Sequence, residues 1–469
     1  MSGPRFLGSK IGVMDHRSAT STRPDHRPSD ADGQALWQSA VDVLEGNWSR
    51  DHTMPSHTLY PHQWSWDSAF ISVGLARYAP ARAWQELRSL FEAQWADGRV
   101  PHIVFDPGVS ERDYFPGPAF WRAPRPPGAP GRCTTGVVQP PVHALAAWEI
   151  YRQSGADGAA EPAARDELRW LYPRLVAQQR YLSGRRDVGG YGLASIVHPW
   201  ESGLDNSPSW DAALSAVPVD HGLLRRHHRR DIDVAEAAHR PTDDDYTRFI
   251  AIAEAYRDRQ YEDTALAAGY PFLVECPGFN AISAAAESAL ADIAEVVGAD
   301  PVPHRERAAQ LTKALVEVLY DPDTGMFHAR DVRTGKLSNA HCVNGLVPLI
   351  LGDLPAALVG SLLAQARSPR FGLAGSGGLP LPSYDRTAPD FDRLRYWRGP
   401  VWININWLLW RGLRSHGHAV LAAALRGSML RLVEQAGCFE YFDPVTGAGI
   451  GSPAFSWTAA LALDLLAEG

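Results

Sequence analysis

Apolar residues recur at intervals of three and four along most of this chain, which is the spacing of one face of an α-helix. In residues 68–78, for example, Ile71, Leu75 and Tyr78 follow this spacing, and no alternating strand pattern competes with it. The same periodicity predicts about eleven helices, at residues 32–44, 68–78, 81–95, 142–151, 165–182, 279–297, 304–319, 354–366, 400–414, 418–435 and 456–467. Such a pattern favours an all-α fold.

Loops rich in Gly, Pro and Trp join these helices, which suggests helix pairs arranged in a ring. Two of the loops share a motif, Asp321-Pro-Asp-Thr-Gly325 and Asp443-Pro-Val-Thr-Gly447, and each follows a long helix. In this motif the Asp accepts local backbone hydrogen bonds, Pro fixes φ and Gly takes positive φ. Coincidence could explain the match, because such turns are common, but helices of similar length before both turns indicate a repeated helix pair.

The first 31 residues contain no apolar run and are rich in Pro, Arg, Ser, Asp and His, which predicts a disordered tail rather than a secretory signal. No break in composition divides residues 32–469, so they are predicted to form a single domain. No segment approaches the roughly 18 apolar residues of a membrane span, and we expect a soluble, cytoplasmic protein. The net charge of −8 argues against binding to nucleic acid or to an anionic membrane.

The four cysteines, Cys133, Cys276, Cys342 and Cys438, are far apart and form no CxxC pair. They are expected to be reduced thiols. His341 and Cys342 could supply half of a metal site, but a buried structural pair explains them better. The sequence therefore predicts no metal site, and it leaves a homo-oligomer open.

Four clusters mix aromatic side chains with carboxylates, amides, hydroxyls or arginine at predicted helix ends, at residues 60–67, 198–208, 395–402 and 438–457. The chain has 16 Trp beside 15 Tyr and 15 Phe, and flat aromatic faces suit the apolar side of a sugar ring. Carboxylates and amides suit its hydroxyls. The clusters therefore predict a carbohydrate site, although any single Trp could equally pack between helices.

Hydrolysis of a glycosidic bond needs one protonated carboxyl group for the departing oxygen and one carboxylate for the attacking water. The clusters offer four candidates: Asp67, Glu201, Asp205 and Glu440. Each also has a structural explanation, as a helix-capping acid (Asp67), an arginine partner (Glu201), a turn residue (Asp205) or a helix-end carboxylate (Glu440). These residues alone do not decide which two would react.

Two segments interrupt the helical pattern. Residues 113–132 carry six prolines among aromatic residues, and residues 225–245 are highly charged and expected to be solvated. Long loops of this kind are often lids over a site, although a static surface loop explains the second segment equally well.

The chain resembles glycoside hydrolase family 63, and within it the bacterial mannosylglycerate and glucosylglycerate hydrolases. The resemblance covers roughly residues 32–469. Four stretches carry it, in the same order as in the family: Gln63-Trp-Ser-Trp-Asp67-Ser-Ala-Phe70, His198-Pro-Trp-Glu-Ser-Gly-Leu-Asp205-Asn-Ser-Pro, Tyr396-Trp-Arg-Gly-Pro-Val-Trp402 and Phe439-Glu440-Tyr-Phe-Asp-Pro-Val-Thr-Gly447.

The resemblance implies an (α/α)₆ toroid that inverts the configuration of an α-linked sugar without a metal or organic cofactor. Asp205 would be the general acid and Glu440 the general base. The sugar pocket would be lined by Trp64, Trp66, Asp67, Gln139, Trp200, Tyr396, Trp397 and Trp402. The clusters add further substrate-binding candidates: Tyr60, Glu201, Asn206, Gly399 and Trp457. Tyr114, with the arginines near it, is the candidate clamp for a glycerate carboxylate.

These assignments carry physical expectations. Asp205 must keep its proton near neutral pH, so aromatic surface from Trp200 or Trp210 should lie against it. Inversion predicts a separation of about 6.5–9.5 Å between the two carboxyl groups.

The leading functional hypothesis is hydrolysis of a small glycosylated compatible solute, glucosylglycerate or mannosylglycerate. The alternative is a trehalase or an oligosaccharide α-glucosidase. A non-catalytic carbohydrate-binding protein is a third hypothesis. A zinc-dependent toroid would need a converging Cys/His set, which the spacing does not indicate.

Overall fold

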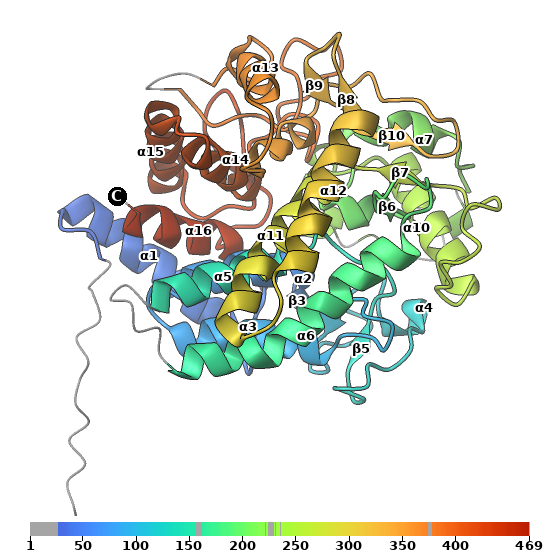
Figure 1. Cartoon of the computed structure of the whole chain (residues 1–469), viewed down its shortest axis with the longest axis horizontal. Helices are drawn as coiled ribbons and strands as arrows, with labels where there is room; N and C mark the ends of the chain where they lie inside the picture. The colour runs from blue at the N-terminus through green and yellow to red at the C-terminus, as the bar shows by residue number, and fades with distance from the viewer. Residues whose placement is uncertain are drawn as a thin grey trace, which may run out of the picture.

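Helices carry most of the fold (Figure 1), in a computed structural model that describes residues 27–154, 162–220, 222–223, 229, 231–234, 236–373 and 378–468. All the predicted helices are present with ends shifted by a few residues: α1 (Ala31–Asn47), α2 (Ser65–Leu75), α3 (Pro80–Glu92), α5 (His143–Ser154), α6 (Pro162–Arg185), α11 (Pro277–Val297), α12 (Val302–Leu319), α13 (Ala356–Arg367), α14 (Ile403–Ser415), α15 (Ala419–Ala436) and α16 (Ser456–Ala467). A further long helix, α10 (Asp243–Asp258), begins with a capping box at Thr242.

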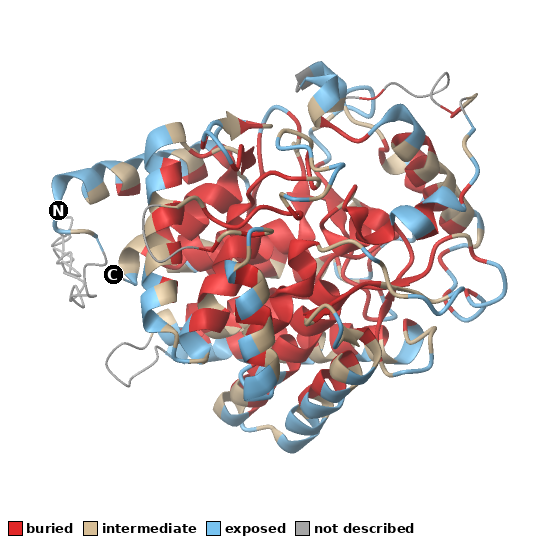
Figure 2. Cartoon of the chain, turned by 90° about the horizontal axis from the view of Figure 1, so that it is seen from above, coloured by how far each residue is buried: buried red, intermediate tan, exposed pale blue. Residues whose placement is uncertain are grey.

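Six helical elements contact one another in a closed ring, in the order α2, α5, α11, η4 with η5, α14 and α16, which returns to α2. Every residue of α2 is buried, as a helix that is surrounded on all sides requires. The outer helices α1, α3, α6, α12 and α15 each pack against an inner one. Figure 2 shows the result, with buried residues at the centre and exposed residues on the peripheral helices.

The inner element between α11 and α14 consists of two 3₁₀ helices, η4 (Val343–Gly345) and η5 (Val347–Ile350), where no helix was predicted. Gly345 packs so closely that a Cβ atom there would collide with the backbone carbonyl of Phe327. Pro348 cannot donate a backbone hydrogen bond. A regular helical pattern is therefore absent from the sequence of this element.

Short hairpins follow outer helices at two equivalent places. In the first, Tyr320–Asp321 (β8) pairs with Met326–Phe327 (β9), and in the second, Tyr441–Phe442 (β11) pairs with Gly449–Ile450 (β12). Strands of two residues are too short to produce a detectable alternating pattern, which is why none was predicted.

The two predicted Asp-Pro-x-Thr-Gly turns form these hairpins with the same internal bonds. In each, the Gly N–H donates to the Asp carbonyl over 2.9 Å, and the Gly residue adopts positive φ, 68° at Gly325 and 75° at Gly447. In each, the Thr hydroxyl also donates to the Asp carboxylate. The sequence match therefore marks structurally equivalent turns.

Two three-stranded sheets brace the entrance to the ring. One joins β3 (Gln63–Trp64), β4 (Ile103–Phe105) and β5 (Cys133–Thr134), and the other joins β6 (Ser195–Ile196), β7 (Val274–Glu275) and β10 (Arg330–Asp331), all antiparallel. Because β3 runs directly into α2, the first sheet fixes where the side chains of the first turn of α2 point.

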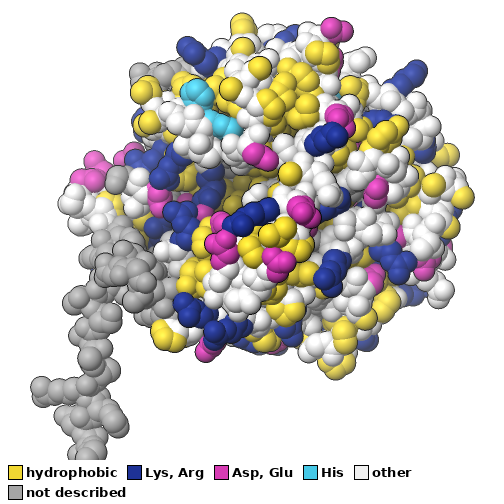
Figure 3. All heavy atoms as spheres, in the orientation of Figure 1, with side chains coloured by type: hydrophobic (Ala, Val, Ile, Leu, Met, Phe, Trp, Pro, Cys, Tyr) yellow, Lys and Arg dark blue, Asp and Glu magenta, His cyan; other side chains and the backbone are white. Residues whose placement is uncertain are grey.

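Within the described residues, no helix is long and apolar enough to cross a membrane, and the four cysteines are free thiols, as predicted. Acidic and basic side chains are interspersed over the face drawn in Figure 3. The predicted disordered tail lies outside the described residues up to position 26, and α1 begins at Ala31.

Candidate active site

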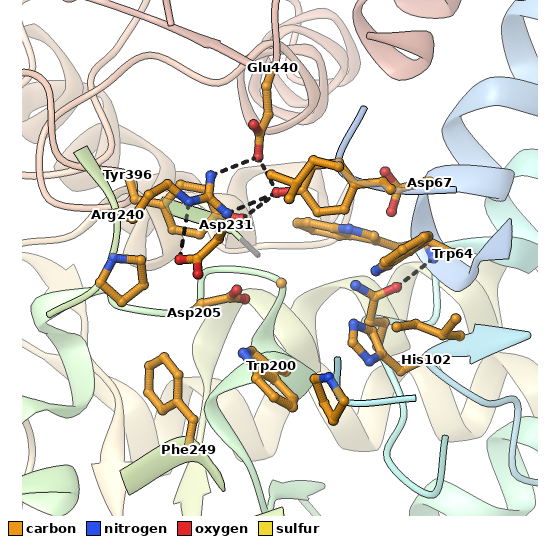
Figure 4. Close-up of a pocket in the computed structure, with 18 of the residues that line it drawn as sticks. Trp64, Asp67, His102, Trp200, Asp205, Asp231, Arg240, Phe249, Tyr396 and Glu440 are labelled. Carbon is orange, nitrogen blue, oxygen red and sulfur yellow. Dashed lines mark hydrogen bonds and ion pairs between the residues drawn. The ribbon is translucent and has the colours of Figure 1, made fainter. Parts of the chain in front are cut away.

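A pocket of about 960 Å³ opens at the end of the ring where the inner helices begin. The first turns of α2 and α16, the segment before α5 and the loop before β11 all contribute to its wall. Carboxyl groups from distant parts of the chain face it, with Glu440 and Asp205 on opposite sides in Figure 4. The pocket therefore joins acids that lie far apart in the sequence.

Asp205 lies in the loop after η1 (Pro199–Ser202), and its carboxyl group faces the pocket. The indole of Trp210 donates to the Asp205 carbonyl over 2.9 Å and fixes this loop. Burial raises the pKa of Asp205 to about 7, against an opposing effect of the Arg240 charge, and nearby Glu440 adds to the rise. A carboxyl group with such a pKa can hold a proton near neutral pH.

Glu440 precedes β11 and is 1% exposed. The Tyr60 hydroxyl donates to its Oε1 over 2.6 Å, and Arg240 approaches the same oxygen at 3.4 Å. The backbone N–H of Ser452 donates to its Oε2 over 3.1 Å. Donors on both oxygens hold this carboxylate in one orientation.

Asp67 is the third residue of α2, and its carboxyl group lines the pocket rather than capping the helix. Burial raises its pKa well above the usual range, and the negative charges of Glu440, Glu86 and Asp205 contribute in the same direction. The pocket therefore contains a third carboxyl group, which favours a protonated form that can donate to a sugar hydroxyl.

Aromatic rings form most of the remaining wall. Trp397 lines the pocket and stacks on Trp402 behind it, at 3.8 Å between ring centroids with planes 5° apart, and Trp402 stacks in turn on Tyr441. On the opposite side His102 stacks against Trp200. Burial lowers the pKa of His102 to about 3, so this imidazole is neutral and adds no charge to the wall.

The sequence model of the mannosylglycerate hydrolase MGH1-like glycoside hydrolase domain matches residues 60–458. The chain belongs to this glycoside hydrolase family. A mannosylglycerate hydrolase from Rubrobacter radiotolerans is 40% identical over 447 residues, which cover 95% of this chain and 100% of that protein. The glucosylglycerate hydrolase from Mycolicibacterium hassiacum is 36% identical over 460 residues, covering 94% and 99%.

A crystal structure of the GH63 mannosylglycerate hydrolase from Thermus thermophilus, in complex with Tris and D-glycerate, superimposes with a TM-score of 0.83 at 41% identity. The match covers 91% of this chain and 99% of that one. The resemblance to glycoside hydrolase family 63 is thereby confirmed.

The pocket of this family member contains most of the residues singled out in the sequence. Twelve of the sixteen predicted site residues line it: Tyr60, Trp64, Trp66, Asp67, Tyr114, Gln139, Trp200, Asp205, Tyr396, Trp397, Glu440 and Trp457. The Gln139 side-chain oxygen also accepts the backbone N–H of Trp66 over 3.1 Å, which ties two parts of the wall together.

The other four predicted residues do not line the pocket and lie behind its wall, where each contacts other protein groups. Both Glu201 oxygens are occupied by Arg186, at 2.7 and 2.8 Å, and by backbone N–H groups, so this acid is the arginine partner considered above. Asn206 accepts the backbone N–H of Trp397. Gly399 bonds to Ser383, and Trp402 backs Trp397.

Two pocket residues, Asp231 and Arg240, come from the charged segment 225–245 that was expected to be solvated, and a third, Tyr246, follows it directly. That expectation was wrong at Arg240, which is 5% exposed. Its charge is balanced by Glu440 and Asp231, at 3.4 and 3.6 Å. The composition of a charged segment does not show whether its charges face solvent or buried partners. Of the two partners of Arg240, Glu440 is distant in the sequence and Asp231 belongs to the same charged segment.

Residues 113–132 also form part of the wall, through Tyr114, Phe115, Pro116 and Trp121. The arginines near Tyr114 do not line the pocket within the described residues. Arg122 pairs with Asp258, and Arg132 bonds to Ser89 and Asp51. The guanidinium that faces the pocket is instead that of Arg240.

Proposed function

We propose that this chain is an inverting α-glycoside hydrolase that cleaves glucosylglycerate or mannosylglycerate to the free sugar and glycerate. The observation that carries the proposal is one aromatic pocket in which Asp205, with a pKa raised to about 7, faces a fixed carboxylate, Glu440. The named activities of the family relatives support the substrate class. We also propose that the closed ring of helix pairs is an (α/α)₆ toroid.

In the proposed reaction, Asp205 donates its proton to the glycosidic oxygen as the bond from that oxygen to the anomeric carbon breaks. A water molecule bonds to the same carbon from the opposite face, and Glu440 takes a proton from it. The sugar leaves with inverted configuration. Asp205 then regains a proton from solvent and Glu440 releases one, and no step uses a metal or an organic cofactor.

We assign the aglycone side of the pocket from the positive charge that lines it. Arg240 is the guanidinium that lines the described pocket, and the phenols of Tyr114 and Tyr246 lie in the same wall. A buried cation with hydroxyl groups beside it suits a carboxylate. A neutral disaccharide offers no anionic group to Arg240, which then pairs, in the described part of the chain, only with Glu440 and Asp231, so the site favours a glycerate conjugate over trehalose or maltose.

A substrate panel tests the proposal. The purified chain is incubated separately with glucosylglycerate, mannosylglycerate, trehalose and maltose, and free sugar is measured over time. Release from a glycerate conjugate well ahead of both disaccharides is expected. Release from a disaccharide alone would move the function to a trehalase or α-glucosidase, and release from none would contradict the proposal and favour a carbohydrate-binding protein.

A further inference from the structure

Asp231 begins the short helix α9 (Asp231–Val234) and places a negative charge inside the pocket. Figure 4 draws it between Arg240 and Asp205. Its side chain is 13% exposed. The reaction proposed above gives this carboxylate no task, although it lies where the aglycone is proposed to bind.

Two arginines share this carboxylate unequally. Arg229 donates through Nε to Oδ1 over 3.1 Å and through Nη2 to Oδ2 over 2.6 Å, which is a bidentate pair. Arg240 Nε lies 3.6 Å from Oδ2, beyond the length of an N–H···O hydrogen bond. Asp231 is therefore anchored to Arg229 and pairs only loosely with Arg240.

The Nε group of Arg240 is buried and has no hydrogen-bond partner in the described part of the chain. Other N–H groups of the same guanidinium reach Tyr60 at 3.1 Å and Glu440 at 3.4 Å. A buried donor without an acceptor is unfavourable. The position beside Nε thus favours an acceptor that can approach more closely than Asp231 does.

An incoming carboxylate would meet Asp231 at this position. The phenols of Tyr114 and Tyr246 are close by, since the Asp231 charge contributes, after burial, to the raised pKa of each. Two carboxylates cannot occupy the same side of one guanidinium without repulsion. Binding of an acidic aglycone therefore requires Asp231 to give up its contact with Arg240, whereas Asp231 can keep its hydrogen bonds to Arg229.

We propose that Asp231 is an internal competitor for the aglycone carboxylate, held by Arg229 beside Arg240 and displaced when glycerate binds. The inference rests on the proposed function. Its consequence is weaker binding of glycerate, and so faster release of this product, than Arg240 alone would give. Asp231 is a specificity-determining residue in this account, not a catalytic one.

The test compares binding of D-glycerate to the wild-type chain and to Asp231→Asn by calorimetry, with kcat and KM for the preferred glycerate conjugate. The variant keeps the shape of the side chain and removes its charge. Kd and KM are both expected to fall about five-fold, the scale of a loose, partly exposed ion pair. Since release becomes slower, kcat should not rise, and inhibition by D-glycerate should become stronger.

Arg229→Gln gives a prediction of opposite sign. Without its anchor, Asp231 can pair fully with Arg240, so D-glycerate should bind more weakly than to the wild type. Asp243→Asn is the matched control, because Asp243 also bonds to Arg229, at 2.7 Å, but is 70% exposed. Its Kd should stay within about two-fold of the wild type.

Weaker glycerate binding by Asp231→Asn would overturn the inference, because it would make Asp231 a residue that positions Arg240 for the ligand. Unchanged binding in both Asp231→Asn and Arg229→Gln would overturn it as well. Either result leaves the proposed function intact if the wild type still cleaves the conjugate. A wild type that neither binds D-glycerate nor cleaves a conjugate contradicts both proposals.

Discussion

Burial of Asp205 has two consequences, one for its role as a general acid and one for the stability of the folded chain. The protonated form that burial favours is the one a general acid needs, and the ionised form costs stability in the folded chain. The pKa rises from 3.8 to about 7. The folded state therefore retains a proton that the unfolded chain has lost between these two values, and the stability from this group is lost as the pH rises through about 7.

We accordingly expect kcat/KM to fall about ten-fold for each pH unit above about 7. Asp205→Asn should lower turnover at least about 100-fold, and it should melt at a higher temperature than the wild type at pH 8, but not below pH 4. A pH–rate profile and melts at pH 4 and pH 8 measure both effects. Full activity at pH 9 would show that Asp205 is not the acid.

Glu440 depends on a glycine for its orientation. Gly451 has φ of 76°, and a Cβ atom there would collide with Glu440 Oε2. Gly451→Ala is expected to lower kcat more than about ten-fold, because the carboxylate must turn away from its donors. Gly447→Ala is the control in the same hairpin, with φ of 75° but no contact to Glu440. Equal losses of kcat in the two variants would show that backbone strain, and not the collision with Glu440, lowers kcat.

At the scale of elements, Glu201 joins two loops that form the pocket. Its oxygens accept the backbone N–H groups of Val138, next to Gln139, and of Val197, at the start of the loop that leads to Asp205. Arg186 neutralises it. A residue behind the wall thus fixes two parts of the wall.

Glu201→Gln should lower the free energy of unfolding by about 3 kcal/mol or more, because it leaves the buried Arg186 charge partly unpaired. Denaturant melts measure the loss. Glu86→Gln is the comparison: Glu86 is also fully buried and accepts hydrogen bonds from Thr53 and Ser68, but no arginine pairs with it among the described residues, so its amide variant should lose less stability. A Glu201 variant as stable as the Glu86 variant would contradict this role.

At the scale of the whole molecule, the ring closes where the first and last inner helices meet. Arg77, just after α2, donates to Asp464 of α16 over 3.0 and 2.7 Å, and the indole of Trp407 from α14 donates to the same acid over 2.8 Å. Three helices of the ring therefore share one buried carboxyl group at the end opposite to the pocket.

Arg77→Met should destabilise the chain by about 3–5 kcal/mol, because Asp464 loses its buried cation. The pocket lies one helix length away, about 16 Å for the 11 residues of α2, so KM should stay unchanged at temperatures where the variant is folded. Melting curves and KM measured on the same sample check both statements. A change in KM without a loss of stability would contradict this account.

Helical periodicity predicted eleven of the helices, because inner and outer helices alike keep apolar residues at helical spacing. It did not predict the long helix α10, whose first turn lies in the charged segment 225–245. It failed at η4 and η5, where Gly345 and Pro348 interrupt the spacing, and at hairpins with strands of two residues. Recurrent aromatic and acidic residues indicated most of the pocket. Arg240 was missed and Glu201 misplaced, because whether a charge faces a ligand or a buried partner depends on residues far away in the sequence.

The most direct test of the central claim is the anomer that the enzyme first releases. Proton NMR is recorded immediately after the wild-type chain is mixed with the glycerate conjugate that it prefers, before mutarotation equilibrates the sugar. If Asp205 and Glu440 act from opposite faces, the β-anomer appears first and the α-anomer follows only by mutarotation. Initial release of the α-anomer would show retention of configuration and would contradict the account.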